Sequence, residues 1–246
     1  MNRRSFLFSA VAASLMAAIP GGSAWAKEPE RVAVLYFENQ GNPELEPLKV
    51  GLAQMLITDL TGSKGIQVVE RAKLQAILDE LELGHSGKVD GDTAAQVGKL
   101  LGAKWLILGS YFELMGTLRI DARLVRVETG EIVASQGVND VANAFMGMEK
   151  KLAEGLKEAL AQKVAPPHTR SETGDGAATA AVITQSTAQV IVAPDAKELA
   201  AAVSFSEGLI YLDKKDVPRA REAFESAVAA NPNLDAAKTE LASLEI

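Results

Sequence analysis

The segment between residues 104 and 138 limits most strongly what this chain can fold into, because it reads as three consecutive strands joined by tight turns. The predicted strands are Trp105–Tyr111, Leu118–Val127 and Ile132–Gly137. The middle strand alternates, with Leu118, Ile120, Ala122 and Leu124 on one face and Arg119, Asp121 and Arg123 on the other. This alternation is typical of a strand with one buried face. The first strand is apolar on both faces, which predicts a place in the sheet interior.

Helices and two further strands are predicted on either side of this meander. Before it, strands at Arg31–Phe37 and Ile66–Val69 alternate with segments of helical periodicity, of which Leu45–Leu60 is the clearest. A further helix is predicted to run through Leu101, capped by Asp92 or Thr93. After the meander, an amphipathic helix is predicted over Val141–Gln162. The order predicts an α/β (α+β) fold in which helices pack on a mixed sheet.

The N-terminal residues 1–26 have the pattern of a bacterial signal peptide. Arg3 and Arg4 precede an apolar run from Phe6 to Ile19, and a small-x-small site, Ala24-Trp25-Ala26, follows. We expect cleavage before Lys27, although retention as an N-terminal anchor is the alternative. The paired arginines with Phe6 and Leu7 resemble a twin-arginine export signal, and the general secretory route stays open. The protein is therefore expected in the periplasm. Any association with the outer membrane is expected to occur through partner proteins.

Composition excludes several classes of function. The chain has 32 acidic and 25 basic residues, a formal charge of −7, and loses two arginines with the signal peptide. An acidic protein is a poor candidate for binding nucleic acid. It has no cysteine, so disulfides, thiolate metal sites and a lipid-modified cysteine are excluded. No later segment has the roughly 20 apolar residues of a membrane-spanning helix. We therefore expect no integral membrane span after cleavage.

No motif predicts a cofactor, a metal or a catalytic group. The two histidines are His85, in a glycine-containing loop, and His168, in a predicted linker. Acidic residues near His85 lack a recognised metal-ligand spacing, so we expect a structural or solvated role for it. Dinucleotide-binding and P-loop patterns are missing from the sequence. Glu70 and Arg71 are interpreted as a helix start with a surface ion pair.

The C-terminal part predicts a second, smaller helical module. Residues 164–194 have the proline, glycine, alanine and threonine content of a linker, in which Thr187–Val192 is a candidate isolated strand. Residues 195–246 resemble a tetratricopeptide (TPR) repeat followed by a terminal helix, with small, aromatic and proline residues at the expected positions: Gly208, Tyr211, Ala220, Phe224, Ala227 and Pro232. The aromatic and leucine expected earlier in the repeat are replaced by Ser204 and Glu207. Asp216 is predicted to cap the second helix, with Pro218 in its first turn.

The segment from Arg31 to Asn139 resembles the CsgG family, the curli production assembly and transport component, and the related N-terminal domain of TolB. The resemblance lies in five ordered stretches: Arg31–Asn39, Gly51–Gly62, Val68–Gly87, Ala94–Ser110 and Leu118–Val133. It implies a CsgG-like domain over residues 27–163. Two departures argue against a pore: there is no cysteine to lipidate, and the Met115–Thr117 turn is too short for membrane-spanning hairpins.

Two groups of residues are candidates for partner binding. Arg119, Asp121 and Arg123 form a charged stripe that is either a solvated sheet face or a docking face. Phe205, Leu209 and Leu212 follow helical spacing on the first repeat helix and either line a peptide groove or pack against the terminal helix.

The sequence supports a non-enzymatic, exported accessory or scaffold protein. We expect contacts with envelope or secreted proteins through a sheet edge or face and through the helical module. The alternative is a self-assembling ring or structural subunit at the outer membrane. A third hypothesis, an exported cofactor enzyme, has no motif behind it.

Overall fold

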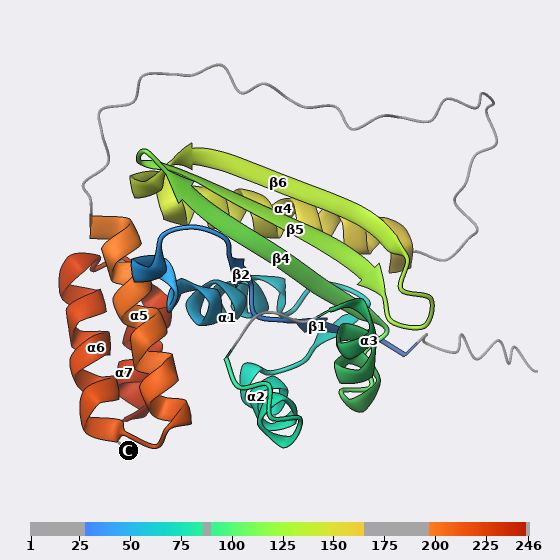
Figure 1. Ribbon diagram of the computed structural model, residues 1–246, viewed down its shortest axis with the longest axis horizontal. Coiled ribbons are helices and arrows are strands. Elements are labelled where there is room, and N and C mark those ends of the chain that lie inside the picture. Colours follow the sequence, from blue (N-terminus) through green and yellow to red (C-terminus); the bar gives the residue numbers. More distant parts are fainter. Residues whose placement is uncertain (1–27, 86–89, 165–196, 245–246) are drawn as a thin grey trace, which may run out of the picture.

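The computed structural model describes residues 28–85, 90–164 and 197–244, and these form a six-stranded mixed sheet with helices packed around it (Figure 1). The strands are β1 (Glu30–Val34), β2 (Glu38–Asn39), β3 (Ile66–Val68), β4 (Trp105–Leu114), β5 (Thr117–Arg126) and β6 (Ile132–Val141). The helices are α1 (Leu48–Leu60), α2 (Arg71–Glu80), α3 (Gly91–Leu100), α4 (Phe145–Val164), α5 (Lys197–Asp213), α6 (Val217–Ala230) and α7 (Asp235–Ser243). The predicted signal peptide, His168 and the candidate strand Thr187–Val192 lie outside the described residues.

The predicted meander is confirmed, and it supplies half of the sheet. The strand order is β3-β1-β4-β5-β6, and β2 also pairs with β4. Strand β4 is parallel to β1 and antiparallel to β5, so it lies in the sheet interior as its apolar sequence predicts. The mixed α/β fold class is therefore confirmed.

The inner face of the sheet carries the main core. Leu118, Ile120, Ala122 and Leu124 are at most 1% exposed, as their alternation predicts. Helix α4 runs along β5 and β6 on this face (Figure 1). A side chain at Gly109 would collide with the Phe37 ring, whose nearest atom lies 2.1 Å from the position of a Cβ. Glycine in the central strand therefore lets an aromatic ring lie directly on the backbone.

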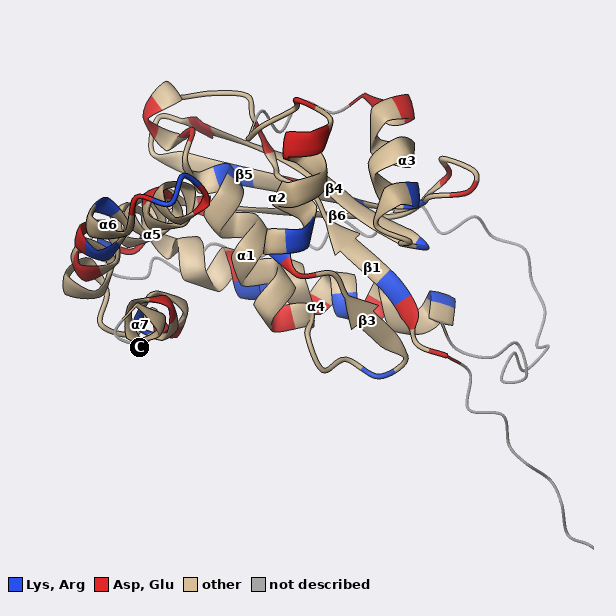
Figure 2. Cartoon of the chain, turned by 90° about the horizontal axis from the view of Figure 1, so that it is seen from below, with Lys and Arg blue, Asp and Glu red and all other residues tan. Residues whose placement is uncertain are grey.

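On the opposite face, α3 covers only one end of the sheet. A Cβ at Gly98 would lie 2.8 Å from Val127 and 3.1 Å from Leu106, so the helix packs closely on these two side chains. The acidic first turn and the basic last turn of α3 are visible in Figure 2. Over β5 and β6 the same face is open, because Arg119, Arg123 and Ser135 are exposed.

Helices α4 and α5 pack against α1, which consequently is buried on nearly every side. The crossing of α1 and α5 uses small residues: a Cβ at Gly51 would lie 2.0 Å from Ser206 Oγ. Gly208 makes the same kind of close contact with the Phe224 ring across α5 and α6. Asp216 caps α6 by accepting a bond from the Arg219 amide at 3.3 Å, as predicted. The TPR assignment itself stays a prediction.

Two predicted boundaries were wrong. The Asp90 side chain, rather than that of Asp92 or Thr93, caps α3, accepting a bond from the Thr93 amide at 2.8 Å. Val141 ends a strand and does not start a helix, because it pairs with Thr117 across the hairpin. In both places a tertiary or capping contact outweighs the local pattern.

Candidate functional site

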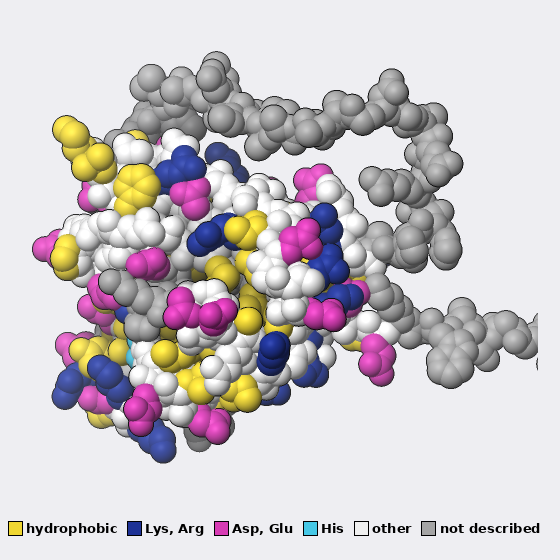
Figure 3. All heavy atoms as spheres, turned by 45° about the vertical axis from the view of Figure 1, so that its right-hand side comes forward, with side chains coloured by type: hydrophobic (Ala, Val, Ile, Leu, Met, Phe, Trp, Pro, Cys, Tyr) yellow, Lys and Arg dark blue, Asp and Glu magenta, His cyan; other side chains and the backbone are white. Residues whose placement is uncertain are grey.

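The uncovered part of the sheet is the strongest candidate for a functional surface. Neighbouring residues of three strands lie there in register: Leu108, Ser110, Phe112, Arg119, Asp121, Arg123, Ser135, Gly137 and Asn139. We call these nine residues the outer sheet face. The predicted stripe Arg119, Asp121 and Arg123 forms its middle row, and Figure 3 shows hydrophobic side chains lying between charged ones on this side of the molecule.

Within this face, Arg119 and Asp121 bind each other. Arg119 Nε and Nη2 donate to the two carboxylate oxygens of Asp121, each at 2.7 Å. This hydrogen bond raises the pKa of the Arg119 guanidinium. Gly137 leaves the room that the pair needs, since a Cβ there would lie 2.7 Å from Asp121 Oδ1. Both charged groups are hydrogen-bonded and exposed to solvent, so the pair adds little stability.

Arg123, by contrast, borders a hollow of about 480 Å³ between α3 and the strands. Leu106, Leu108, Val125 and Ile132 give the hollow its apolar lining. Charged groups of both signs also line it: Lys99, Arg123, Arg126, Asp92 and Glu128. Arg126 is engaged inside the chain, with its guanidinium carbon 5.1 Å from the centre of the Trp105 ring. The hollow suits a partner side chain, and no group of three or more possible metal ligands occurs among the described residues.

A cluster of exposed apolar side chains lies at the other end of the same sheet. Phe112, Leu114, Met115 and Val141 are 36, 64, 95 and 49% exposed, and all lie at or beside the turn between β4 and β5. We call these four residues the hairpin tip. In Figure 3 hydrophobic side chains project over this turn at the upper left.

The second predicted group lies mainly inside the molecule. Phe205 and Leu209 are fully buried, and Leu212 is half-buried. The Phe205 ring packs 5.9 Å from the Phe224 ring of α6, centroid to centroid. A partner cannot reach Phe205 or Leu209 unless α5 moves away from its neighbours.

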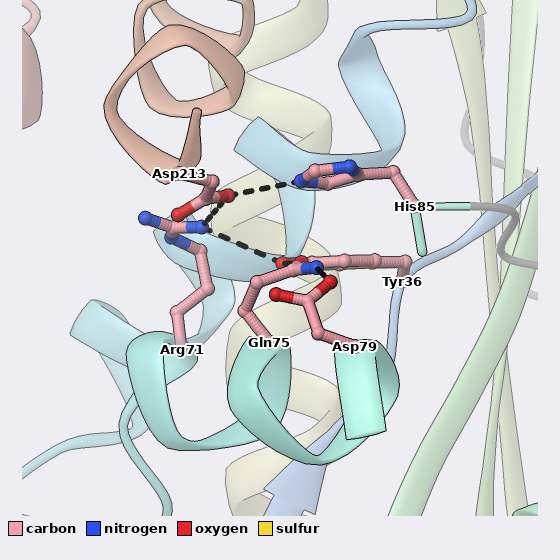
Figure 4. A network of polar contacts seen from close by, with 6 residues as sticks. All are labelled: Tyr36, Arg71, Gln75, Asp79, His85 and Asp213. Atoms are coloured by element: carbon pink, nitrogen blue, oxygen red, sulfur yellow. Dashed lines mark hydrogen bonds and ion pairs between the residues drawn. The ribbon is translucent and has the colours of Figure 1, made fainter. Parts of the chain in front are cut away.

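A polar network, which we call the clamp, joins α2 to the end of α5 (Figure 4). Asp213 Oδ2 accepts from Arg71 Nη1 at 2.6 Å and lies 3.0 Å from His85 Nε2. The His85 ring stacks on the Tyr36 ring with a centroid distance of 5.7 Å. Tyr36 donates to Gln75 Oε1 at 2.6 Å. Gln75 Nε2 in turn donates to Asp79 at 2.6 Å, which completes the network.

Burial sets the electrostatics of the clamp. Burial by itself would raise the pKa of Asp213, but the hydrogen bonds from His85 and Arg71 outweigh it and lower that pKa. Burial is also the main reason why the pKa of Tyr36 rises to about 12. The clamp is thus a neutral tyrosine beside an ionised carboxylate whose partners are the Arg71 guanidinium and the His85 ring, and it fastens two parts of the fold.

The sequence did not predict the clamp. Arg71 was interpreted as part of a surface ion pair, which is wrong: it is 8% exposed and its partner is 142 residues away. The structural role expected for His85 fits its position against Tyr36. Only the aromatic Tyr36 at the end of an apolar strand hinted that a polar partner was needed nearby.

Comparison with known protein families finds a match to part of the chain. The family model described as curli production assembly/transport component CsgG matches residues 16–114, which is less than half of the chain. The first four stretches of the predicted resemblance overlap this range. The meander beyond residue 114 and the C-terminal helices lie outside it. A comparison with curated proteins finds no match.

Comparison with solved structures finds remote likenesses. The LpoB C-terminal domain from Salmonella enterica is 18% identical, with 48% of this chain and 87% of that chain covered and a TM-score of 0.39. Lipoprotein GNA1162 from Neisseria meningitidis is 14% identical, with coverages of 55% and 99% and a TM-score of 0.40. TolB from Acinetobacter baumannii is 15% identical, with coverages of 56% and 30% and a TM-score of 0.38.

Proposed function

We propose that this protein is a non-enzymatic accessory or scaffold protein of the cell envelope that holds a partner protein on its outer sheet face. The observation that carries the proposal is a sheet covered by helices on its inner face and left open over much of the other. A solvated sheet face is ordinary in itself. Here it is flanked by a hollow at one end and an exposed apolar tip at the other, which gives a partner three kinds of contact.

The envelope location rests on sequence. The CsgG family match supports an assembly or transport setting, and the signal-like N-terminus supports export. No helix within the described ranges is both long and apolar enough to cross a membrane. The family match and the signal-like N-terminus fit a protein that acts by contact with other envelope proteins.

Affinity capture from a periplasmic extract tests the proposal. The wild-type chain is expected to recover a partner, and Arg123→Glu should reduce the recovery because it reverses an exposed charge beside the hollow. Glu222→Lys on α6 is the control, since it changes an exposed charge on the helical module. A wild-type chain that recovers no partner would contradict the proposal.

Self-assembly is the second candidate, and strand β6 favours it. This edge strand is ten residues long, and Asp140 is its sole charged residue. Long edge strands with few charges readily pair with another chain. Light scattering over a range of protein concentrations tests this candidate, and a single monomeric mass at every concentration would exclude it.

A further inference from the structure

We infer that the hairpin tip is a docking finger, which inserts into an apolar pocket with a basic rim on a partner protein. The inference rests on the proposed function, because it names the kind of partner surface that the open side of the sheet receives.

The first observation is the clustering of exposed apolar side chains. Seven large hydrophobic residues are exposed in the described part of the chain, and four of them form the hairpin tip. Single exposed apolar residues need no explanation, whereas a cluster at one place marks an interaction surface. Methionine and aromatic side chains are enriched at the centres of protein interfaces. A projecting turn requires a concave receptor, so the partner surface is a pocket.

The second observation is the backbone at Met115. Its φ of 52° lies in the left-handed region, and the following Gly116 has a φ of 80°. Two-residue hairpin turns with two positive φ angles favour asparagine, aspartate or glycine at both positions. Methionine at the first position therefore makes the turn less stable, while its side chain is 95% exposed and contributes no packing to the fold. A residue unfavourable for both reasons is best explained by contact with another molecule.

The third observation is the charge around the tip. Glu113 lies in β4, two residues before Met115, and its carboxylate accepts a bond from the Gly116 amide at 2.5 Å. Asp140 lies next to Val141 at the end of β6, and its carboxylate accepts only a backbone bond, from the Val141 amide at 2.8 Å. No ion pair to either carboxylate occurs within the described ranges. Two acids beside an apolar tip complement basic groups around the partner's pocket.

The same acids separate this partner from two others. Membranes with anionic lipids repel them, and the whole chain is acidic as well. The hollow of a second copy is lined by charged groups of both signs, with Asp92 and Glu128 beside the cations, so it does not offer a uniformly basic rim. A different protein with a basic rim is therefore the occupant that the charges favour.

Site-specific cross-linking followed by affinity measurement tests the inference. The chain has no cysteine, so a benzophenone attached to Val141→Cys, a tip residue outside the outer sheet face, reports the neighbours of the tip. The cross-linked protein is identified, purified and titrated against variants. Leu114→Asn and Met115→Asn should each weaken its binding at least about tenfold, the effect of losing one buried apolar anchor. Glu113→Gln should weaken binding severalfold at low salt and little at high salt.

Leu100→Asn on α3 and Val217→Asn on α6 are the matched controls, because both residues are about half exposed and lie away from the tip. Equal losses for tip and control variants would overturn the inference. Vesicles of phosphatidylcholine with phosphatidylglycerol provide the membrane arm, and binding to them that Met115→Asn abolishes would also overturn it. Binding to a second copy at the tip would do the same.

The outcomes separate this inference from the proposed function. If the affinity of the partner depends on Arg123 but not on the tip, the inference is wrong and the proposed function is retained. If the wild-type chain recovers no partner at all, the proposed function itself is contradicted.

Discussion

Two sides of the molecule differ in whether their side chains find partners within the chain. One is the closed side, where α1 meets α5, and the other is the open side, which carries the outer sheet face. On the first side, apolar residues and charges find partners within the chain: Gly51 lies on Ser206, and Arg71 reaches Asp213. On the second side, Arg123 and Met115 have no comparable contacts among the described residues. The comparison teaches that helical spacing alone does not mark a binding surface, since the predicted groove residues Phe205 and Leu209 lie in the core.

The sharpest way to break this comparison is to remove one acid from each side. Asp213→Ala should lower the free energy of unfolding by about 3 kcal/mol, because it leaves the Arg71 guanidinium buried without its carboxylate. Asp121→Ala removes the acid of the exposed Arg119 pair and should cost under about 1 kcal/mol. Urea denaturation measures both, and equal losses would contradict the account.

The Asp213 contribution also has a defined pH dependence. Its pKa is lowered from the ordinary value of 3.8, so the stabilisation is present above that pH and is lost as the pH falls through the folded-state pKa. The difference between wild type and Asp213→Ala should therefore shrink on strong acidification.

Two helical glycines sharpen the comparison through packing. Gly51→Ala should destabilise the protein by about 2 kcal/mol, because the new methyl group overlaps Ser206 at the α1–α5 crossing. Gly147→Ala on α4 meets open space and should stabilise by about 0.5–1 kcal/mol. Ser206→Gly in the Gly51→Ala background should restore part of the loss. Thermal unfolding distinguishes the signs, and two losses of similar size would count against the close crossing.

A buried acid on α4 gives the free energy of unfolding a second dependence on pH. Glu149 is 2% exposed, its Oε1 has no hydrogen-bond partner, and burial raises its pKa to about 8. Its folded-state pKa lies above the ordinary 4.5, so stability is full below pH 4.5 and falls as the pH rises towards 8. The loss is at most about 1.4 kcal/mol per pH unit.

Glu149→Gln should flatten this pH profile and make the protein more stable than wild type at pH 8. Glu154→Gln, an exposed acid on the same helix, should leave the profile unchanged. Chemical denaturation from pH 5 to 8 measures the stability of both variants. A wild-type stability that does not change with pH would contradict a raised pKa of Glu149.

The smallest effect is expected on the open side. Met115→Asn should raise the free energy of unfolding by about 0.5 kcal/mol, because asparagine tolerates the left-handed backbone better. The same change should weaken partner binding, so stability and binding move in opposite directions. A destabilised Met115→Asn variant in thermal unfolding would argue that the methionine serves the fold.

The sequence was sufficient for the sheet because strand periodicity is a local property. The alternation at Leu118–Leu124 correctly gave both faces of β5, and the apolar Trp105–Leu108 segment correctly placed β4 inside the sheet. The clamp was beyond reach because Arg71 and Asp213 are far apart in sequence and neither lies in a motif. Small residues such as Gly51 and Ser206 likewise acquire meaning only when the two helices that they join are known.

The central claim is that partners dock on the open side of the sheet and not on the helical module. Cross-linkers on Ser135→Cys of the outer sheet face and on Ser226→Cys of α6 test it in a cysteine-free background, because both positions are exposed. The account predicts protein adducts from position 135 in the periplasm and none from position 226. Adducts from position 226 alone would contradict it.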